Sequence, residues 1–187
     1  MIYIYRHKRN ELQVYNRLIM QNTLKKVGLG ILVLLVVIQF IRPEKNIQTA
    51  KATHHISKLY PVPVAVEATL IKACYDCHSN NTYYPWYNNL QPVAWWLNHH
   101  VDEGKHEINF DEFASYRIAK QYKKMHECIE EVEEGEMPLN SYTWIHKNAI
   151  LTNEEKTTLV SWFKSIQDSI KANYPADSLV LPKKKKA

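Results

Sequence analysis

The sequence predicts an all-α protein in which a small helical domain follows a single N-terminal transmembrane helix. After residue 60, apolar residues recur at helical spacing, and no stretch alternates apolar and polar residues long enough to form a sheet. The 187 residues include only four glycines, which disfavours an all-β fold with its many tight turns. Before this domain, residues 27–41 form an apolar run with no charged side chain.

The apolar run at residues 24–41 is the expected transmembrane anchor. Its charge-free part spans only about 22 Å at about 1.5 Å per residue. Counting from Leu24, with Lys25 and Lys26 reaching toward the interface, gives about 27 Å, enough for a thin bilayer. The alternatives are a cleaved signal peptide and a buried core helix. The cleavage site would be Ala50-Lys51-Ala52, which lies far past the run, so we favour an uncleaved anchor.

Charge is distributed unevenly along the chain. Residues 1–41 contain six basic residues and one acidic residue, whereas residues 42–182 contain 14 basic and 18 acidic residues. The positive charge before the apolar run predicts that residues 1–23 are cytoplasmic and that the rest is exported. The mildly acidic, scattered charge of the exported part gives no support to nucleic-acid binding.

The exported part divides into a linker, a domain and a tail. Residues 42–60 are polar and are expected to form a linker. Residues 61–175 carry the helical patterns and form the expected domain. Residues 176–187 end in four lysines and alanine, and we expect them to be a disordered basic tail.

Two helices are expected in the first half of the domain. Pro63 can occupy the first turn of a helix, which then runs into Cys74. Residues 79–92 are rich in Asn, Tyr and Pro and are expected to be a loop. Pro92 begins a second helix, for which Gly104 is the expected stop.

Two further helices are expected in the second half. The third is capped by Asp111 and ends at Gly135. The last begins at a capping box, Thr152 to Glu155, and ends at Tyr174-Pro175. The third helix presents an amphipathic stripe made of Ile118, Tyr122, Met125, Ile129 and Val132.

The run Cys-Tyr-Asp-Cys-His at residues 74–78 is the candidate cofactor-attachment site. C-x-x-C-H is the attachment motif of c-type haem. Cys74 and Cys77 can form thioethers to the two vinyl groups of one porphyrin, and His78 is then placed beneath the iron as the proximal ligand. The motif therefore predicts one covalent haem c in a cytochrome c-like helical domain.

Two other interpretations compete with haem attachment. A redox C-x-x-C pair is typical of a βαβ context, which the sequence lacks. A structural zinc site is the stronger rival, because Cys74, Cys77, His126 and Cys128 would make a Cys₃His set. The motif together with an export segment favours haem.

The sixth iron ligand is expected to be Met137. It lies in the run Glu-Met-Pro-Leu between the third and last helices, where Pro138 would stiffen the loop. His/Met ligation is typical of electron-transfer haem proteins. His100 and His146 are the alternative ligands, and a core-filling role is the alternative for Met137.

Aromatic residues are dense after the motif, between residues 83 and 96. A porphyrin is large, flat and apolar, so it needs apolar walls, although aromatic residues also dominate ordinary cores. Trp86 and Trp96 are the expected haem-wall residues.

Residues 59–163 resemble the bacterial haem-binding domain family of small c-type cytochrome-like proteins. The departure from the family is Lys105, where an arginine is common, which weakens an expected contact to a haem propionate. The matching runs are Cys-Tyr-Asp-Cys-His-Ser-Asn-Asn-Thr, Tyr-Pro-Trp-Tyr, Gln-Pro-Val-Ala-Trp-Trp, His-His-Val-Asp-Glu-Gly-Lys, Ile-Asn-Phe-Asp-Glu-Phe, Gly-Glu-Met-Pro-Leu and the stretch 142–149.

The resemblance implies a membrane-tethered or periplasmic haem protein. Together with the apolar run and the positive charge before it, we expect a single-pass protein of the bacterial inner membrane with its haem domain in the periplasm. The resemblance also implies partners among other c-type cytochromes or redox enzymes. We expect a mono-haem electron carrier or haem-binding module rather than an enzyme. The alternatives are a haem peroxidase or a gas or redox sensor with an open sixth site, and the zinc module named above.

Overall fold

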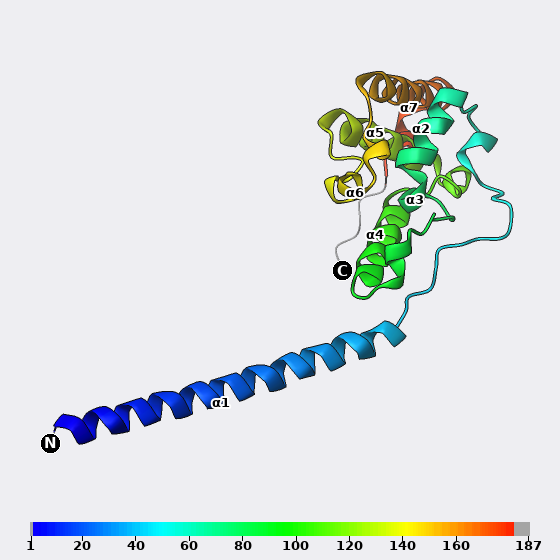
Figure 1. Cartoon of the computed structure of the whole chain (residues 1–187). Coiled ribbons are helices and arrows are strands. Elements are labelled where there is room, and N and C mark those ends of the chain that lie inside the picture. Colours follow the sequence, from blue (N-terminus) through cyan, green and yellow to red (C-terminus); the bar gives the residue numbers. More distant parts are fainter. Residues whose placement is uncertain (1, 182–187) are drawn as a thin grey trace. The chain divides into compact units, whose positions relative to one another are not determined.

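The computed structural model describes residues 2–181, with the side chains of residue 17 and residues 19–181. Within this range the structure is helical and contains no β-strand, which confirms the predicted all-α class (Figure 1). The chain forms two compact units. The N-terminal unit comprises the chain up to Pro43 together with Trp86–Trp96, and the helical domain comprises Glu44–Pro85 and the chain from Leu97 onward.

The N-terminal unit is dominated by one long helix, α1 (Ile2–Val37), followed by a 3-10 turn at Ile38–Phe40. The segment Ile19–Phe40 is long and apolar enough to cross a membrane. None of its residues is buried, which distinguishes it from the core helix of a soluble protein. A signal sequence would meet the same criteria of length and composition.

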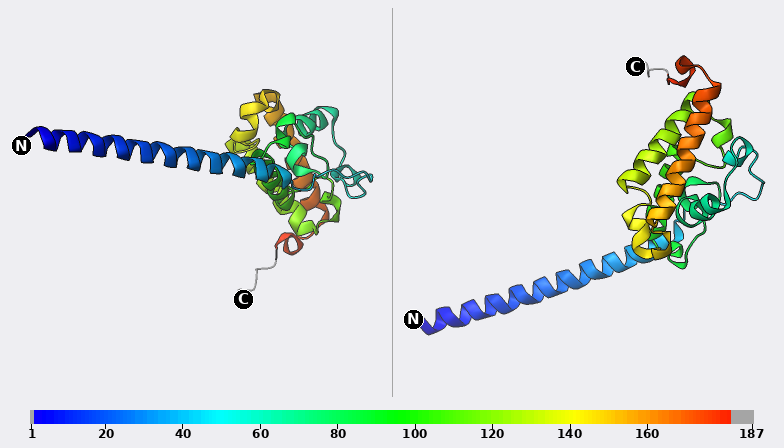
Figure 2. Two further views of the ribbon diagram at one scale, coloured as in Figure 1. Left: turned by 60° about the horizontal axis from the view of Figure 1, so that its bottom comes forward. Right: turned by 90° about the horizontal axis from the view of Figure 1, so that it is seen from above.

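Helices α5 (Ile118–Glu134) and α7 (Asn153–Asn173) form the centre of the helical domain, and they lie side by side in Figures 1 and 2. They run antiparallel, because Gln167 Nε2 donates to the carbonyl of Tyr122 at 3.3 Å while Lys164 pairs with Glu133 at 2.7 Å. Helix α2 (Val64–Ala73) packs against α7.

The expected apolar faces of α5 and α7 form the core. The central and C-terminal part of the α5 stripe is buried, whereas Ile118 and Tyr122 are half-buried. A fully buried side chain of this size contributes about 1.5–3 kcal/mol relative to the exposed state, so these two faces supply much of the stability of the domain. The buried residues of the two faces are Met125, Ile129, Val132, Leu159, Phe163, Ile166 and Ile170.

Two predicted helix boundaries are confirmed in detail. Gly135 ends α5 in the left-handed conformation with φ 79°, which a residue without Cβ adopts at little cost. Thr152 and Glu155 form the capping box of α7, each side chain bonding the backbone N–H of the other.

Two predicted boundaries are wrong. Helix α4 (Val93–Glu107) continues through Gly104, which is therefore not a stop. Asp111 does not cap α5, which begins after Arg117; its carboxylate instead accepts a bond from the backbone N–H of Asn80 at 2.8 Å. Tertiary contacts of both residues explain why local rules misplaced them.

The ordered domain extends beyond both of its expected ends. Within the expected linker, Ile56 is fully buried in the core, and its N–H donates to the carbonyl of Phe110 at 2.8 Å. Past residue 175, Ala176–Leu179 form a 3-10 turn, and Leu179 packs against the core. The rest of the expected disordered tail, residues 182–187, lies outside the described residues.

Candidate functional site

The helical domain contains a partly open cavity of about 510 Å³. This volume falls within the range of about 300–1,000 Å³ that is usual for small-molecule and cofactor sites. Its lining comes from α4, α5, α7, the end of α2, and the segment between α5 and α7. The apolar part of the lining includes Ile108, Phe110, Val132, Leu139, Leu151, Leu159 and Phe163.

The C-x-x-C-H motif lies at one wall of this cavity. Helix α2 ends at Ala73, and a single helical turn, α3 (Tyr75–His78), follows. Within this turn the carbonyl of Cys74 accepts bonds from the backbone N–H groups of Cys77 and His78, at 3.2 and 3.0 Å. The compact turn brings Cys74, Cys77 and His78 to the lining of the same cavity.

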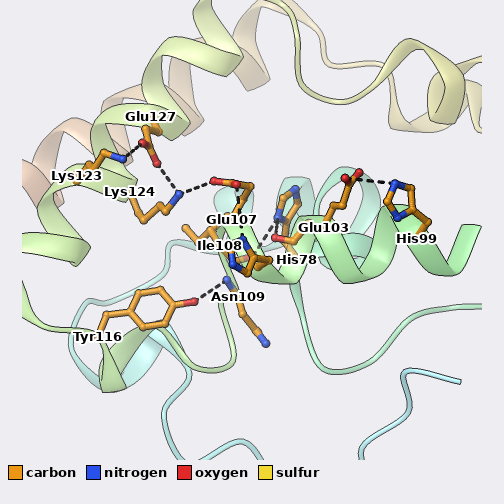
Figure 3. A network of polar contacts seen from close by, with 12 residues as sticks. His78, His99, Glu103, Glu107, Ile108, Asn109, Tyr116, Lys123, Lys124 and Glu127 are labelled. Atoms are coloured by element: carbon orange, nitrogen blue, oxygen red, sulfur yellow. Dashed lines mark hydrogen bonds and ion pairs between the residues drawn. The ribbon is translucent and has the colours of Figure 1, made fainter. Parts of the chain in front are cut away.

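The imidazole of His78 is held in one orientation by the C-terminal end of α4. Its Nδ1 lies 2.8 Å from the carbonyl oxygen of Gly104 and 3.0 Å from that of Ile108. Figure 3 shows the ring beside this end of α4. Because carbonyl oxygens only accept, Nδ1 carries the proton and Nε2 keeps its lone pair. Burial lowers the pKa of His78, which favours the same neutral form.

Position 104 has no room for a side chain, because α4 lies directly against the motif there. A Cβ at this position would lie 2.7 Å from the carbonyl oxygen and 3.1 Å from the Cβ of Cys77. The absence of a side chain lets the two backbones approach closely, and this approach places the Gly104 carbonyl within reach of His78. The sequence signal for this contact is a glycine within a helical pattern, which by local rules predicts a helix stop.

The three cysteines are free thiols, and each is half-buried. Burial raises the pKa of Cys74 to about 12 and that of Cys77 to about 11, and it also raises the pKa of Cys128. Reactive C-x-x-C pairs of redox enzymes instead have lowered thiol pKa values. The environment of Cys74 and Cys77 therefore does not match that of a thiol–disulfide catalyst.

Met137 lines the same cavity as the motif. The αL residue Gly135 turns the chain out of α5, and the backbone N–H of Met137 then donates to the carbonyl of Glu131 at 3.1 Å. Pro138 and Leu139 follow in the lining, and helix α6 (Asn140–Ile145) begins directly afterwards. The short segment between α5 and α6 thus presents a methionine to the cavity.

Asp76 connects the motif to α6. One carboxylate oxygen accepts a bond from the Tyr142 hydroxyl at 2.7 Å, and the other accepts from the backbone N–H of Tyr83 at 3.0 Å. Asp76 and Tyr142 also line the cavity. Sequence reasoning missed this pair, because 66 residues separate its members and Asp76 occupies a position of the C-x-x-C-H motif at which any residue is allowed.

A buried lysine connects α4 to α5 beside His78 (Figure 3). The ammonium group of Lys124 lies 2.7 Å from a carboxylate oxygen of Glu107 and 2.7 Å from one of Glu127. All three residues line the cavity, and the Lys124 side chain is only 10% exposed. The bond from Lys124 holds the pKa of the Glu107 carboxyl below its usual value.

The alternative ligands are placed differently from one another. His100 lines the cavity, whereas His146 is not part of the lining and stacks on Tyr142 with ring centroids 4.3 Å apart. Lys105, which the resemblance places near a haem propionate, donates to the side-chain oxygen of Asn46. Met137 and His100 thus share the cavity with His78, and the choice between them as sixth ligand stays a prediction.

The zinc set is not assembled. Cys74, Cys77 and Cys128 line the cavity, but the His126 side chain is 59% exposed and pairs with Glu130. Among the described residues, no three His, Cys, Asp or Glu side chains are grouped to hold a metal ion.

Trp86 and Trp96 belong to the N-terminal unit, where their side chains are exposed. Their expected role as haem walls stays a prediction.

The residues that line the cavity fit a haem. Two cysteines, a histidine with a free Nε2 lone pair and a methionine meet at one apolar cavity, and this is the donor set of a c-type haem. The fold and the cavity thus define a small helical haem-binding protein.

The family comparison agrees with this class. A model of the haem-binding domain family matches residues 33–165, which is most of the chain. The chain therefore belongs to the haem-binding domain family. Searches of curated proteins and of solved structures returned no match.

Proposed function

We propose that this protein is a membrane-anchored, mono-haem c-type electron carrier. The observation that carries the proposal is that Cys74, Cys77, His78 and Met137 line a single cavity. Cys74 and Cys77 would hold the porphyrin through thioethers, His78 would supply the proximal ligand and Met137 the sixth. When bound, haem supplies an iron that changes oxidation state by one electron.

The protein side of this function is preorganisation of the ligands. The carbonyls of Gly104 and Ile108 fix the ring and the tautomer of His78, so that no reorientation is needed to present Nε2. The bond from Met137 N–H to Glu131 fixes the backbone of the second ligand. A thioether ligand from Met137 would raise the reduction potential of the haem iron, which would favour electron transfer over substrate binding.

The apolar lining contributes by excluding water. Phe110, Leu159 and Phe163 are each at most 2% exposed and belong to both the core and the cavity wall. A dry, rigid surrounding limits rearrangement of solvent when the charge of the iron changes, and it also tunes the potential.

The anchor and the surface charge suggest where the protein acts. The apolar segment Ile19–Phe40 follows a basic N-terminus, which predicts a periplasmic helical domain at the bacterial inner membrane. Between residues 127 and 136 the chain carries six glutamates, and two of them, Glu127 and Glu131, line the cavity. This negative surface suits a partner cytochrome or redox enzyme with a basic patch.

The test of electron transfer is the ligation of the iron. The full chain is produced with haem-attachment machinery, and optical spectra are compared between Met137→Leu and Met125→Leu. Both changes roughly conserve volume, but only Met137 lines the cavity, while Met125 is fully buried in the core. We expect the long-wavelength absorption band of methionine-ligated oxidised haem in the wild type and in Met125→Leu, and its loss in Met137→Leu.

The same spectra distinguish the open-site alternative. High-spin wild-type spectra with rapid carbon monoxide binding would contradict the electron-carrier proposal and favour a peroxidase or a sensor. Persistence of the methionine band in Met137→Leu would show that another residue supplies the sixth ligand.

A further inference from the structure

Within the N-terminal unit, the segment Trp86–Trp96 is bonded to the C-terminal end of the apolar helix. The side chain of Gln39 accepts from the backbone N–H of Gln91 at 2.9 Å and donates to its carbonyl at 3.2 Å. In return, the Gln91 side-chain amide donates to the carbonyl of Ile41 at 2.8 Å. These bonds satisfy polar backbone groups of both segments at the point where the apolar helix ends.

Two more bonds extend this connection. The indole N–H of Trp95 donates to the same Ile41 carbonyl at 3.0 Å. Arg42 donates to the side-chain oxygen of Asn89 at 3.4 Å. The segment Trp86–Trp96 is therefore fixed to the helix end at several points along its length.

The apolar side chains of this arrangement are nevertheless exposed. Trp86 is 76% exposed, Trp96 44% and Phe40 84%, and Leu90 and Trp95 are also exposed. Residues 86–96 include three tryptophans and one tyrosine but no charged residue. An exposed, uncharged, aromatic-rich surface of this kind marks a place where a protein meets another apolar phase.

The position of this aromatic surface in the chain indicates that the apolar phase is a lipid bilayer. Trp and Tyr are enriched at the level of lipid headgroups, because their rings are apolar while their N–H and O–H groups stay polar. Here the aromatic segment is bonded to the last residues of a helix that is long and apolar enough to cross a bilayer. The surface is therefore continuous with the part of the chain that would leave the membrane.

We propose that Trp86–Trp96, together with Gln39–Ile41, binds the headgroup region of the bilayer. We call these residues the interfacial segment. It gives the exposed indoles of Trp86 and Trp96 a lipid-facing role instead of the haem-wall role that the sequence suggested. The proposal rests on one part of the proposed function, namely that α1 spans the membrane, and it is independent of haem attachment.

The test measures how deeply single positions enter a bilayer. The full chain with Cys128→Ala is loaded with haem, so that Cys74 and Cys77 are consumed, and is reconstituted in phosphatidylethanolamine–phosphatidylglycerol vesicles. A nitroxide is attached to Leu90→Cys, Leu32→Cys or Ile145→Cys, all at exposed positions. Collision with oxygen, which enters lipid, is compared with collision with a water-soluble nickel complex.

The expected result is a gradient of depth. The label at position 32, within the apolar helix, collides mostly with oxygen, and the label at position 145, on α6, collides freely with nickel. The label at position 90 should show several-fold less nickel collision than the label at position 145 and an oxygen-to-nickel ratio between the two.

Two results would overturn the proposal, and they have different meanings. Equal nickel collision at positions 90 and 145, with position 32 in the bilayer, would show that the interfacial segment lies in water although the anchor is inserted. Free nickel collision at position 32 would show that the anchor itself fails. Covalent haem is quantified in the same samples, and if attachment fails, Cys74 and Cys77 are also changed to serine, so that the nitroxide still labels a single position and the depth test does not depend on haem.

Discussion

The two expected iron ligands, His78 and Met137, are held in very different ways. His78 is fixed by a one-turn helix, by the carbonyls of Gly104 in α4 and of Ile108 directly after it, and by a backbone contact that only glycine permits. Met137 is half-buried in a short segment after α5, and its backbone N–H has one bond, to Glu131. One ligand is built into packed helices, whereas the other is presented by a loop.

This difference separates two tasks of the site. The His78 side makes a rigid place for attachment, because three neighbouring residues of the chain face one cavity. The Met137 side depends on contacts made elsewhere, above all the bond between Tyr142 and Asp76 that connects α6 to the motif. We therefore expect changes on the His78 side to affect haem attachment and stability, and changes on the Met137 side to affect ligation while haem stays attached.

Gly104→Ala should disrupt the packing around His78 and have the largest effect on stability and haem attachment. Alanine usually stabilises a helix interior by about 1 kcal/mol relative to glycine. Here its Cβ would lie 2.7 Å from a backbone oxygen of Cys77, which cannot rotate away, so overpacking of about 1–3 kcal/mol or more outweighs that gain. The expected result is a lower unfolding temperature of the domain and a reduced yield of covalent haem.

The matched control for this change is Gly30→Ala. A Cβ at Gly30, in α1, meets nothing within 4 Å. Unfolding temperature and haem yield should therefore stay at wild-type values in this variant. Wild-type behaviour of Gly104→Ala would show that α4 does not press against the motif.

Tyr142→Phe should weaken the support of the Met137 segment and have an intermediate effect, seen in the ligation of the haem. The change removes a hydrogen bond to a carboxylate, which contributes about 1.5–3 kcal/mol when it is shielded from water. The fraction of methionine-ligated haem should fall, as seen in the long-wavelength band, while covalent haem content stays constant. Tyr83→Phe, at a 79% exposed tyrosine, serves as the control and should leave the band unchanged.

Lys124→Ala tests the ion pairs beside His78 and should have the smallest effect on stability. Lys124 is 10% exposed and pairs with Glu107 and Glu127, but Glu107 is 67% exposed, so water screens part of the interaction. We expect a loss of about 1 kcal/mol in the free energy of unfolding, measured with denaturant.

Lys123→Ala is the neighbouring control for Lys124→Ala. Its side chain is 53% exposed and has one ion pair, also with Glu127, so the loss should be at most about 0.5 kcal/mol. Equal losses in the two variants would mean that the ion pairs of Lys124 with Glu107 and Glu127 stabilise the domain no more than an ordinary surface ion pair does.

Local sequence signals predicted the helical class, the capping box at Thr152 and the left-handed stop at Gly135, because each depends on residues close together in the chain. The same holds for Cys74, Cys77 and His78, whose spacing defines the motif. Gly104 and the Asp76–Tyr142 bond depend instead on segments that meet only after folding. The sequence alone could not show which neighbours those residues would have.

The most direct test of the account is whether the haem is covalent. The full chain is produced with haem-attachment machinery, denatured, and analysed for haem that stays with the polypeptide. We predict one covalent haem per chain in the wild type and in Cys128→Ser, and none in Cys74→Ser/Cys77→Ser. Haem that is extracted from the denatured wild type, or retained by the double variant, would contradict the account.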